Sequence, residues 1–347
     1  MLTFVPDFFS AMNSSSNNKA LLALGIVSFF WGTTYLASRI GAQEMPGLFL
    51  AALRQFISGT ILLVYFLGIK RYSIPDRTTL KKIFTQGFFM LVLGNGLSTW
   101  SVQYISSGLA AIIAALIPLL VVLFSIVMLK NASFTRNIII GLLIGLAGIT
   151  AIFYEYLSDL LNPDYAFGLI LNLVAISCWA FGTVYTSKNK LQIDVLYGVG
   201  WQMFLSGCIM LPASFLLGQT SDFTGVHLDG FLSLAYLIII GSLLCYSAYV
   251  YSIKHLPPAR ATIYAYINPI IAVFLGWLVL DERLNLNVGF GTAITIVGVY
   301  LVNNEFRKQV NISSGKNVKE NTRIPELIEE KGSFTTLPLE KGELKRD

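Results

Sequence analysis

Ten apolar segments, separated by short polar stretches, make up most of the chain. They cover roughly residues 20–40, 45–68, 83–105, 107–129, 136–153, 167–187, 195–217, 231–253, 258–280 and 286–303. An α-helix of about 20 apolar residues spans the hydrocarbon core of a bilayer. The pattern therefore predicts an all-α polytopic membrane protein with ten transmembrane helices. Residues 304–347 mix charged and small residues without periodic apolar positions, which predicts a disordered tail.

Composition agrees with a membrane protein and shapes the expected partners. Of the 347 residues, 55% are hydrophobic and 12% are charged, whereas soluble domains carry about 25% charged residues. The net charge of +5 comes from basic residues in short loops and the tail, so it does not indicate nucleic-acid binding. We expect the lipid bilayer and a small-molecule substrate as partners, with no nucleic acid. The sequence leaves open whether the chain forms a homodimer.

Two of the segments carry a proline near the middle. Ser107–Leu129 contains Pro118, and Pro258–Leu280 contains Pro269, which lies 151 residues later. Proline has no N–H and its ring crowds the carbonyl four residues earlier, so each should kink its helix. The freed backbone groups need a partner that lipid cannot supply. A packing kink is the simplest interpretation of either proline alone, but matched kinks in two halves of a chain favour a substrate site at the midplane.

The kinked segments belong to a longer internal repeat. Phe56-Ile57-Ser58-Gly59 in the second segment returns as Phe204-Leu205-Ser206-Gly207 in the seventh. In the same way Gly148 in the fifth segment returns as Gly298 in the tenth. The spacing between copies is close to that between the two prolines, which indicates one duplicated unit of five helices.

The duplication predicts how the two halves lie in the membrane. The copies cover residues 20–153 and 167–303, joined by an outer linker over 154–166. Because five is odd, the second copy must enter the membrane from the side opposite to the first. We therefore expect two inverted five-helix repeats, a layout typical of secondary transporters that alternate access around a central site.

Basic residues in the loops predict the orientation. With the N-terminus inside, the inner loops hold 12 Lys and Arg residues, against two in the outer ones, Arg39 and Arg283. Because positive loops stay on the cytoplasmic side, we expect a cytoplasmic N-terminal segment over residues 1–19 and a cytoplasmic tail over 304–347. The three cysteines lie in apolar segments and are expected to be small core residues rather than disulfide partners.

Several short motifs together resemble a known family. They are F-W-G-T-T-Y at 30–35, L-R-Q-F at 53–56, S-S-G-L-A-A at 106–111, P-L at 118–119 and L-D-E-R-L at 280–284. The chain resembles the drug/metabolite transporter superfamily, in particular proteins with two EamA domains. The resemblance implies a secondary transporter, here expected to be an exporter of small metabolites in the bacterial inner (plasma) membrane. It also implies a Glu after the fourth helix of each repeat, which Glu282 supplies in the second repeat and nothing supplies in the first.

Arg54 is the one charged residue well inside a predicted span. An arginine at the membrane centre costs about 2.5–3.5 kcal/mol on insertion scales, so it should face the bundle and be hydrogen-bonded. It could anchor carbonyl groups of a neighbouring helix or clamp an anionic substrate. The resemblance implies an arginine at this position across varied substrates, which favours the anchor. Its counterpart in the repeat is Gln202.

Polar and aromatic side chains within the spans are the candidates for binding substrate. Tyr264 and Asn268 are four residues apart and therefore share a helix face. An aromatic cavity with few charges suits amphipathic metabolites such as amino acids, nucleobases or lipophilic drugs. The predicted substrate-binding residues are Trp31, Tyr35, Asn95, Trp100, Trp179, Tyr246, Tyr264, Tyr266 and Asn268.

The absence of some residues and motifs narrows the possible mechanisms. The predicted spans contain no Asp or Glu, the chain has no P-loop motif, and its Cys and His residues lack the spacing of a zinc site. We therefore expect neither a metal nor a cofactor, and no enzyme activity. An intramembrane lipid- or prenyl-transfer enzyme is the alternative from another class, and such an enzyme usually needs acidic or His side chains near the membrane. A permeation channel is the other alternative.

Overall fold

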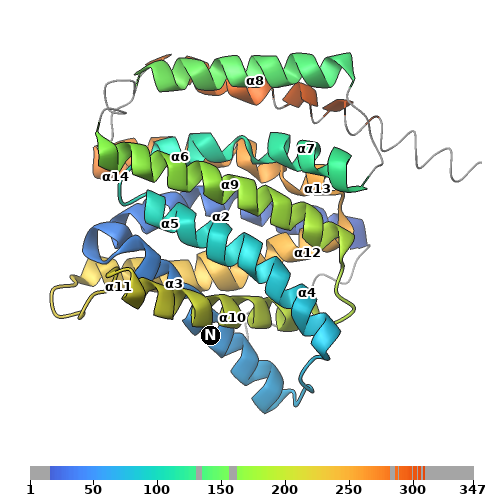
Figure 1. Ribbon diagram of the computed structural model, residues 1–347, viewed down its shortest axis with the longest axis vertical. Coiled ribbons are helices and arrows are strands. Elements are labelled where there is room, and N and C mark those ends of the chain that lie inside the picture. Colours follow the sequence, from blue (N-terminus) through green and yellow to red (C-terminus); the bar gives the residue numbers. More distant parts are fainter. Residues whose placement is uncertain are drawn as a thin grey trace, which may run out of the picture.

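The computed structural model describes residues 16–129, 135–155 and 162–281, together with 286–308 except for 288, 299, 303, 306 and 307. Within these residues the chain is helical and contains no strand. The helices pack into one bundle (Figure 1). Glu282, the N-terminal segment up to residue 15, residues 156–161 of the outer linker and most of the tail lie outside the described residues.

Several helices join end to end into longer rods. In chain order the elements are α2 (Ser16–Glu44), α3 (Gly47–Leu63), η1 (Val64–Ile69), α4 (Arg77–Gly87), η2 (Phe88–Gly96), α5 (Leu97–Ser101), α6 (Ser107–Ala114), α7 (Ile117–Leu129), α8 (Arg136–Glu155), α9 (Pro163–Lys188), α10 (Val195–Leu216), α11 (Leu228–Tyr236), η4 (Leu237–Tyr246), α12 (Ser247–His255), α13 (Pro258–Ala261), η5 (Ile263–Tyr266) and α14 (Asn268–Leu280). η1, η2 and η4 are π-helical, whereas η5 is a 3₁₀-helix. The rods α3–η1, α4–η2–α5 and α11–η4–α12 are each uninterrupted.

Seven helices in the described part of the chain are long and apolar enough to cross a membrane. They are Asn18–Glu44, Gly47–Ile69, Ser107–Leu129, Pro163–Lys188, Val195–Leu216, Leu228–His255 and Pro258–Leu280. Shorter apolar helices cover Arg136–Gly145 and Gly289–Val302. The third apolar segment of the sequence is the rod α4–η2–α5. The chain is thus an all-helical protein with several membrane-capable helices, as the hydropathy pattern predicted.

Short polar side chains mark where several helices begin. Asp76 accepts hydrogen bonds from the backbone N–H groups of Thr78 at 3.0 Å and Thr79 at 3.3 Å, and Asp194 accepts from that of Tyr197 at 3.1 Å. The first N–H groups of a helix have no partner within the helix, so such caps satisfy them. They fix the starts of α4 and α10 directly after polar loops.

Both proline-containing segments are interrupted. The first is helical up to Ala114 and resumes at Ile117, and in the turn between them Leu116 N donates to Ile113 O at 3.0 Å. The second is a single α-turn, then the 3₁₀-helix η5, then α14, with Ile267 N donating to Tyr264 O at 3.0 Å. Each break lies just before a proline, where the missing N–H removes a helical bond.

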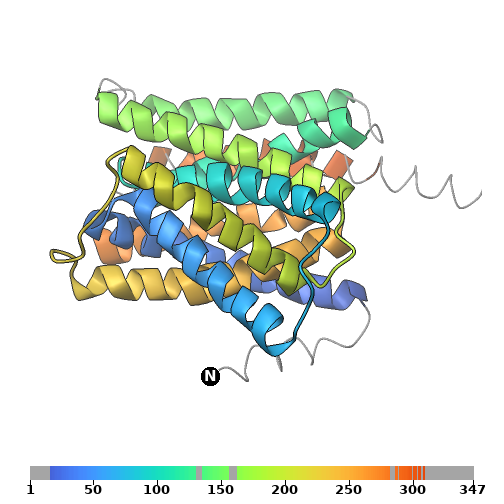
Figure 2. The same cartoon turned by 60° about the horizontal axis from the view of Figure 1, so that its bottom comes forward.

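The two repeats meet where α3 packs against α10, which run side by side in Figure 2. A Cβ added at Gly59 would stand 2.2 Å from Phe204 N, and one added at Gly207 would stand 2.6 Å from Phe56 N. The rings of Phe56 and Phe204 stack with centroids 5.5 Å apart. Only glycine lets the two backbones come this close. The matching F-x-S-G sequences therefore form one contact, in which each copy contacts its own counterpart.

Other pairs of elements repeat this reciprocity. α2 packs against η4, while α9 packs against η2. α8 lies at one side of the bundle next to the helix of residues 289–302 (Figure 1). There a Cβ at Gly148 would stand 2.5 Å from Thr295 N, and one at Gly298 would stand 2.3 Å from Gly145 N. The glycines that return in the sequence are thus the points where helices come closest.

Candidate functional site

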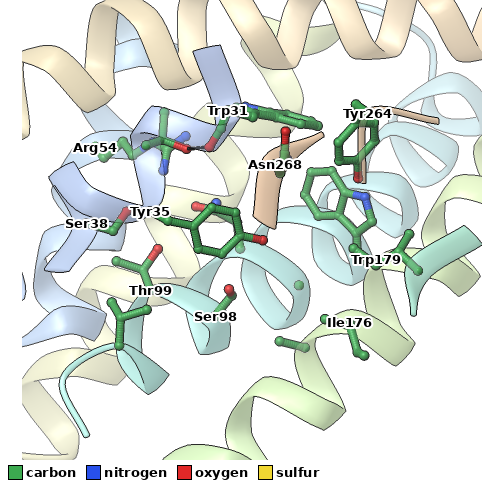
Figure 3. A pocket seen from close by; sticks show the side chains of 16 residues that line it. Trp31, Tyr35, Ser38, Arg54, Ser98, Thr99, Ile176, Trp179, Tyr264 and Asn268 are labelled. Atoms are coloured by element: carbon green, nitrogen blue, oxygen red, sulfur yellow. Dashed lines mark hydrogen bonds between the residues drawn. The ribbon is translucent and has the colours of Figure 1, made fainter. Parts of the chain in front are cut away.

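A cavity lies in the middle of the bundle, between elements of both repeats (Figure 3). The space between its walls, including its open mouth, is about 630 Å³. The lining residues are Trp31, Thr34, Tyr35, Ser38, Arg54, Gly94, Asn95, Ser98, Thr99, Val102, Ile117, Ala175, Ile176, Trp179, Tyr264 and Asn268. They combine aromatic rings, hydroxyls and amides with one cation, and include no carboxylate.

An aromatic layer, consisting of Trp31, Trp179, Tyr249 and Tyr264, closes one end of this cavity. The Trp31 ring lies 5.4 Å from Trp179, 5.0 Å from Tyr249 and 4.9 Å from Tyr264, measured between centroids. Trp179 stacks on Tyr249 at 5.5 Å. Along α2 the lining residues begin at Trp31, and along α9 they end at Trp179. Beyond the layer, Thr183 Oγ1 and Tyr249 Oη are hydrogen-bonded at 2.9 Å.

A second, smaller cavity lies on the other side of the aromatic layer. Its empty volume is about 340 Å³. It is lined by Gln86, Thr186, Lys190, Leu191, Ile193, Asp194, Val195, Gly198, Gln202, Val250 and Lys254. Along α9 it therefore lies further toward the C-terminus than the first cavity. Because a helix rises about 1.5 Å per residue, Trp179 and Thr186 are about 10 Å apart along the axis.

A chain of hydrogen bonds runs along the wall of the second cavity. Tyr246 Oη donates to Gln202 Oε1 at 2.7 Å, and Gln202 Nε2 donates to Gln86 Oε1 at 2.7 Å. Gln86 Nε2 then donates to Asn189 O at 3.0 Å. The three side chains are buried. Buried polar groups are stable only when paired, and here each amide of the two glutamines serves both as donor and as acceptor.

Arg54 lies in the wall of the first cavity, with 4% of the residue exposed. Its Nε donates to Ser242 Oγ at 2.7 Å. A Cβ at Gly241 would stand 2.7 Å from Nη2, so a side chain at this point of η4 would push the guanidinium aside. The same glycine's carbonyl accepts a hydrogen bond from Trp31 Nε1 at 3.2 Å. η4 thus fixes both the cation and the first ring of the aromatic layer.

Asn268 stands at the start of α14, next to the break that Pro269 imposes. With its amide nitrogen turned toward the neighbouring carbonyls, it donates to Ser28 O at 3.1 Å and to Tyr264 O at 3.2 Å. It is 2% exposed and lines the cavity. Asn268 therefore joins α2 to the broken helix while forming part of the cavity wall.

The cavity brings together most of the residues that the sequence singled out. Six of the nine predicted substrate-binding residues line it, as do Arg54 and Ile117, the residue before Pro118. Three do not. Trp100 packs against Phe167 with ring centroids 5.4 Å apart, Tyr246 is bonded to Gln202 beyond the aromatic layer, and Tyr266 is half-buried outside the lining. Gln202 lines the second cavity instead of the first.

Asn172 is a structural residue of the site that sequence reasoning missed. Its side chain is fully buried in α9. Nδ2 donates to Ala110 O at 3.2 Å, and Oδ1 accepts from Ser98 Oγ at 3.3 Å. It thereby joins α9 to the broken fourth segment and holds Ser98 at the cavity wall. A signal was present, because Asn172 is the one amide side chain in the sixth apolar segment.

The family model for the EamA-like transporter family matches the chain twice, at residues 18–154 and 166–304. The chain belongs to the EamA-like transporter family. This confirms the resemblance to two-domain EamA proteins of the drug/metabolite transporter superfamily. Each match covers one copy of the internal repeat, so the duplication in the sequence corresponds to two EamA domains.

The chain also aligns with named relatives over most of their length. The chain is 36% identical over 285 residues to the uncharacterized inner membrane transporter YedA of Escherichia coli K12, covering 82% of this chain and 89% of that protein. It is 24% identical over 286 residues to the uncharacterized transporter YoaV of Bacillus subtilis 168, covering 82% and 96%. A crystal structure at 17% identity matches with a TM-score of 0.60, covering 83% of this chain and 98% of the other, and shows a shared fold.

Proposed function

We propose that this EamA-family protein is a secondary transporter that carries a small metabolite across the bacterial inner membrane by alternating access. Its relatives are named transporters, YedA as one of the inner membrane. The observation that carries the proposal is the central cavity, which is built from both repeats and closed at one end by the aromatic layer. Such a cavity suits an amphipathic compound such as an amino acid, a nucleobase or a lipophilic drug.

Ten membrane-spanning helices in two inverted five-helix repeats are the architecture that we propose. The reciprocal contacts support it. Gly59 meets Phe204 while Gly207 meets Phe56, and η4 meets α2 while η2 meets α9. Contacts in which each copy meets its counterpart are those of a two-fold relation. With an odd number of helices per copy, the axis of that relation lies in the membrane plane.

The proposed orientation places both termini in the cytoplasm and the central cavity in the outer half. The lining residues of α2 lie on the C-terminal side of Trp31, toward the outer end of that helix. The second cavity, lined by Lys190 and Lys254, then lies on the inner side, as the positive-inside rule requires of such lysines. The aromatic layer would separate the outer from the inner half of one pathway.

Export is the direction that we propose. Acidic side chains within spans are the usual proton relays of transporters, and the sequence places none in the predicted spans. A carrier that is not coupled to an ion gradient moves its substrate down the substrate's own gradient. For a metabolite made in the cell, that gradient points outward.

Flux through proteoliposomes tests the proposal. The substitution Ala175→Phe puts a ring into the cavity, which Ala175 lines with 1% exposure. The matched control is Val174→Phe on the same helix, where the side chain is 44% exposed. We expect Ala175→Phe to abolish counterflow of a metabolite panel and Val174→Phe to leave it intact. Absence of flux for every compound in the parent protein, or equal flux in both variants, would refute the proposal.

The same assay separates the alternatives. A permeation channel would conduct without saturation and without counterflow, because no conformational cycle limits it. An intramembrane transferase would convert a lipid substrate while showing no flux. A carrier saturates, and external substrate accelerates the efflux of internal label.

A further inference from the structure

Arg54 brings a positive charge into the wall of the central cavity. It lies within the helix Gly47–Ile69 and is 4% exposed. A cation in a membrane span is stable only when other groups compensate its charge. The partners of this guanidinium therefore indicate what the cavity is built to receive.

The described side chains leave the charge of Arg54 uncompensated. Its hydrogen bond runs from Nε to Ser242 Oγ, a neutral hydroxyl. The ion pairs of the described residues are His227 with Glu44 and Lys308 with Glu305, and the cavity lining includes no Asp or Glu. The N–H groups on Nη1 and Nη2 have no hydrogen-bond acceptor among the described residues.

The geometry at Arg54 presents these N–H groups in a fixed plane. Ser242 occupies Nε, and Nη2 lies in the space that Gly241 leaves free because it has no side chain. A guanidinium held in this way offers a planar set of donors that matches the two oxygens of a carboxylate. One cation balances one negative charge, so a monocarboxylate fits better than a phosphate dianion.

The repeat shows that the fold itself does not need a charge at this position. The counterpart of Arg54 is Gln202, a neutral residue whose amide is bonded to Gln86 and Tyr246. A glutamine at this point of the helix therefore supports the same packing between repeats. Of the two equivalent positions, only that of Arg54 lines the central cavity, and only that one carries a charge.

The rest of the cavity limits the substrate further. The lining holds no carboxylate to pair with an ammonium group, so a zwitterion meets an opposite charge at only one end. The rings of Trp31, Tyr35, Trp179 and Tyr264 offer a surface for an apolar body.

We propose that the central cavity binds organic monocarboxylate anions, with Arg54 as the residue that binds the carboxylate and Ser242 as the residue that positions the guanidinium. The inference rests on the proposed transport function, because it names the substrate class of the same cavity. It goes further in predicting discrimination by charge, with carboxylates preferred over their neutral amides and over zwitterionic amino acids of the same shape.

Binding to the full-length protein in nanodiscs tests this without any flux measurement. The probes are 3-phenylpropanoate, 3-phenylpropanamide and phenylalanine, with hexanoate and hexanamide as an aliphatic pair. Quenching of tryptophan fluorescence reports binding, since Trp31 and Trp179 line the cavity. We expect each carboxylate to bind about tenfold or more tightly than its amide, as a hydrogen-bonded charge pair predicts. Equal binding of acid and amide, or no binding of either carboxylate, would overturn the inference.

Substitutions locate the preference. Arg54→Gln should remove it, so that acid and amide bind alike, and Arg54→Lys should keep part of it. Arg77→Gln removes the same charge at an exposed position outside the lining and should change nothing. If Arg54→Gln does not fold, Ser242→Ala serves instead and should weaken the carboxylate more than the amide. A preference that persists in Arg54→Gln or Ser242→Ala would refute the assignment of these residues.

Flux measurements distinguish a failure of this inference from a failure of the transport function. Saturable counterflow of neutral or cationic compounds, without carboxylate binding, would retain the transporter and exclude the anion site. Carboxylate binding without flux of any compound would retain the site and exclude the transporter.

Discussion

The packing of α3 against α10 allows a quantitative prediction for Gly59→Ala. The added methyl carbon would stand 2.2 Å from Phe204 N and 2.5 Å from Phe204 Cα, whereas ordinary contact begins at 3.4 Å. The obstacle is backbone, so no side-chain rotation relieves it. The helices would have to separate by about 1.2 Å, which is 3.4 Å minus 2.2 Å. Overpacking of this kind costs about 1–3 kcal/mol.

A matched control isolates that cost. Glycine to alanine in a helix contributes up to about 1 kcal/mol in the opposite direction through helix propensity. Gly25 lies within α2 and has nothing within 4 Å of an added Cβ, so Gly25→Ala should show the propensity gain alone. The free energy of unfolding in mixed micelles, measured for both variants, should therefore differ by about 1–3 kcal/mol.

Reciprocity adds a second expectation. Gly207→Ala should destabilise as Gly59→Ala does, because it collides with Phe56 N at 2.6 Å on the same pair of helices. Once one methyl has moved the helices apart, the second methyl collides less. The loss of unfolding free energy in the double variant should therefore be smaller than the sum of the two single losses, by about 0.5 kcal/mol or more. The reasoning would be refuted if Gly59→Ala were as stable as Gly25→Ala, or if the two costs simply added.

Three further changes should give smaller, separate effects. Gln202→Leu leaves the Tyr246 hydroxyl without its acceptor and should cost about 1–3 kcal/mol of unfolding free energy. Gln202→Glu, measured at a pH where the buried carboxyl is protonated, keeps an acceptor for Tyr246 and a donor for Gln86 and should cost less. Asn172→Leu should lower the unfolding free energy by about 1 kcal/mol, because it removes the hydrogen bond to Ala110 O. An unchanged unfolding free energy would contradict the role of Asn172 in joining α9 to the fourth segment. Hydrogen bonds from the Thr79 side chain and then from the backbone N–H groups of Thr79 and Thr78 lower the pKa of Asp76. The stabilisation by this carboxylate is therefore present above the unfolded pKa and is lost as pH falls through the lowered folded value. Asp76→Asn should not show this acid loss in a pH series of unfolding.

Much of the fold could be predicted because a bilayer allows few backbone conformations. Backbone groups in hydrocarbon must pair within a helix, so each long apolar run had to be helical. The breaks before Pro118 and Pro269 follow from the missing N–H in the same way. The close approach of α3 to α10 was encoded in the repeated F-x-S-G sequence, although the sequence did not show that each copy contacts its counterpart.

Which polar side chains line the cavity could be predicted only in part. A helix surrounded by other helices is apolar on every side, so its sequence carries no stripe that marks an inner face. Tyr246 and Tyr264 are both buried aromatic residues, yet one is bonded to Gln202 and the other lines the cavity. The partner of Arg54 was equally hidden, because nothing in the eighth apolar segment distinguishes Ser242 from Ser233, Ser247 or Ser252.

The positions where the two repeats differ are the ones that shape the cavity. Where the copies agree, as at Gly59 and Gly207, they form the contacts that join the halves. Two diverging pairs give the lining a distinct group. Arg54 lines the cavity, whereas its counterpart Gln202 does not. Asn268 and its counterpart Ile117 both line the cavity, but only Asn268 is polar. A symmetric pair of halves is required for two equivalent end states, but the substrate is not symmetric. Divergence confined to the lining would let one chain keep a symmetric conformational cycle while binding an asymmetric ligand in a single orientation.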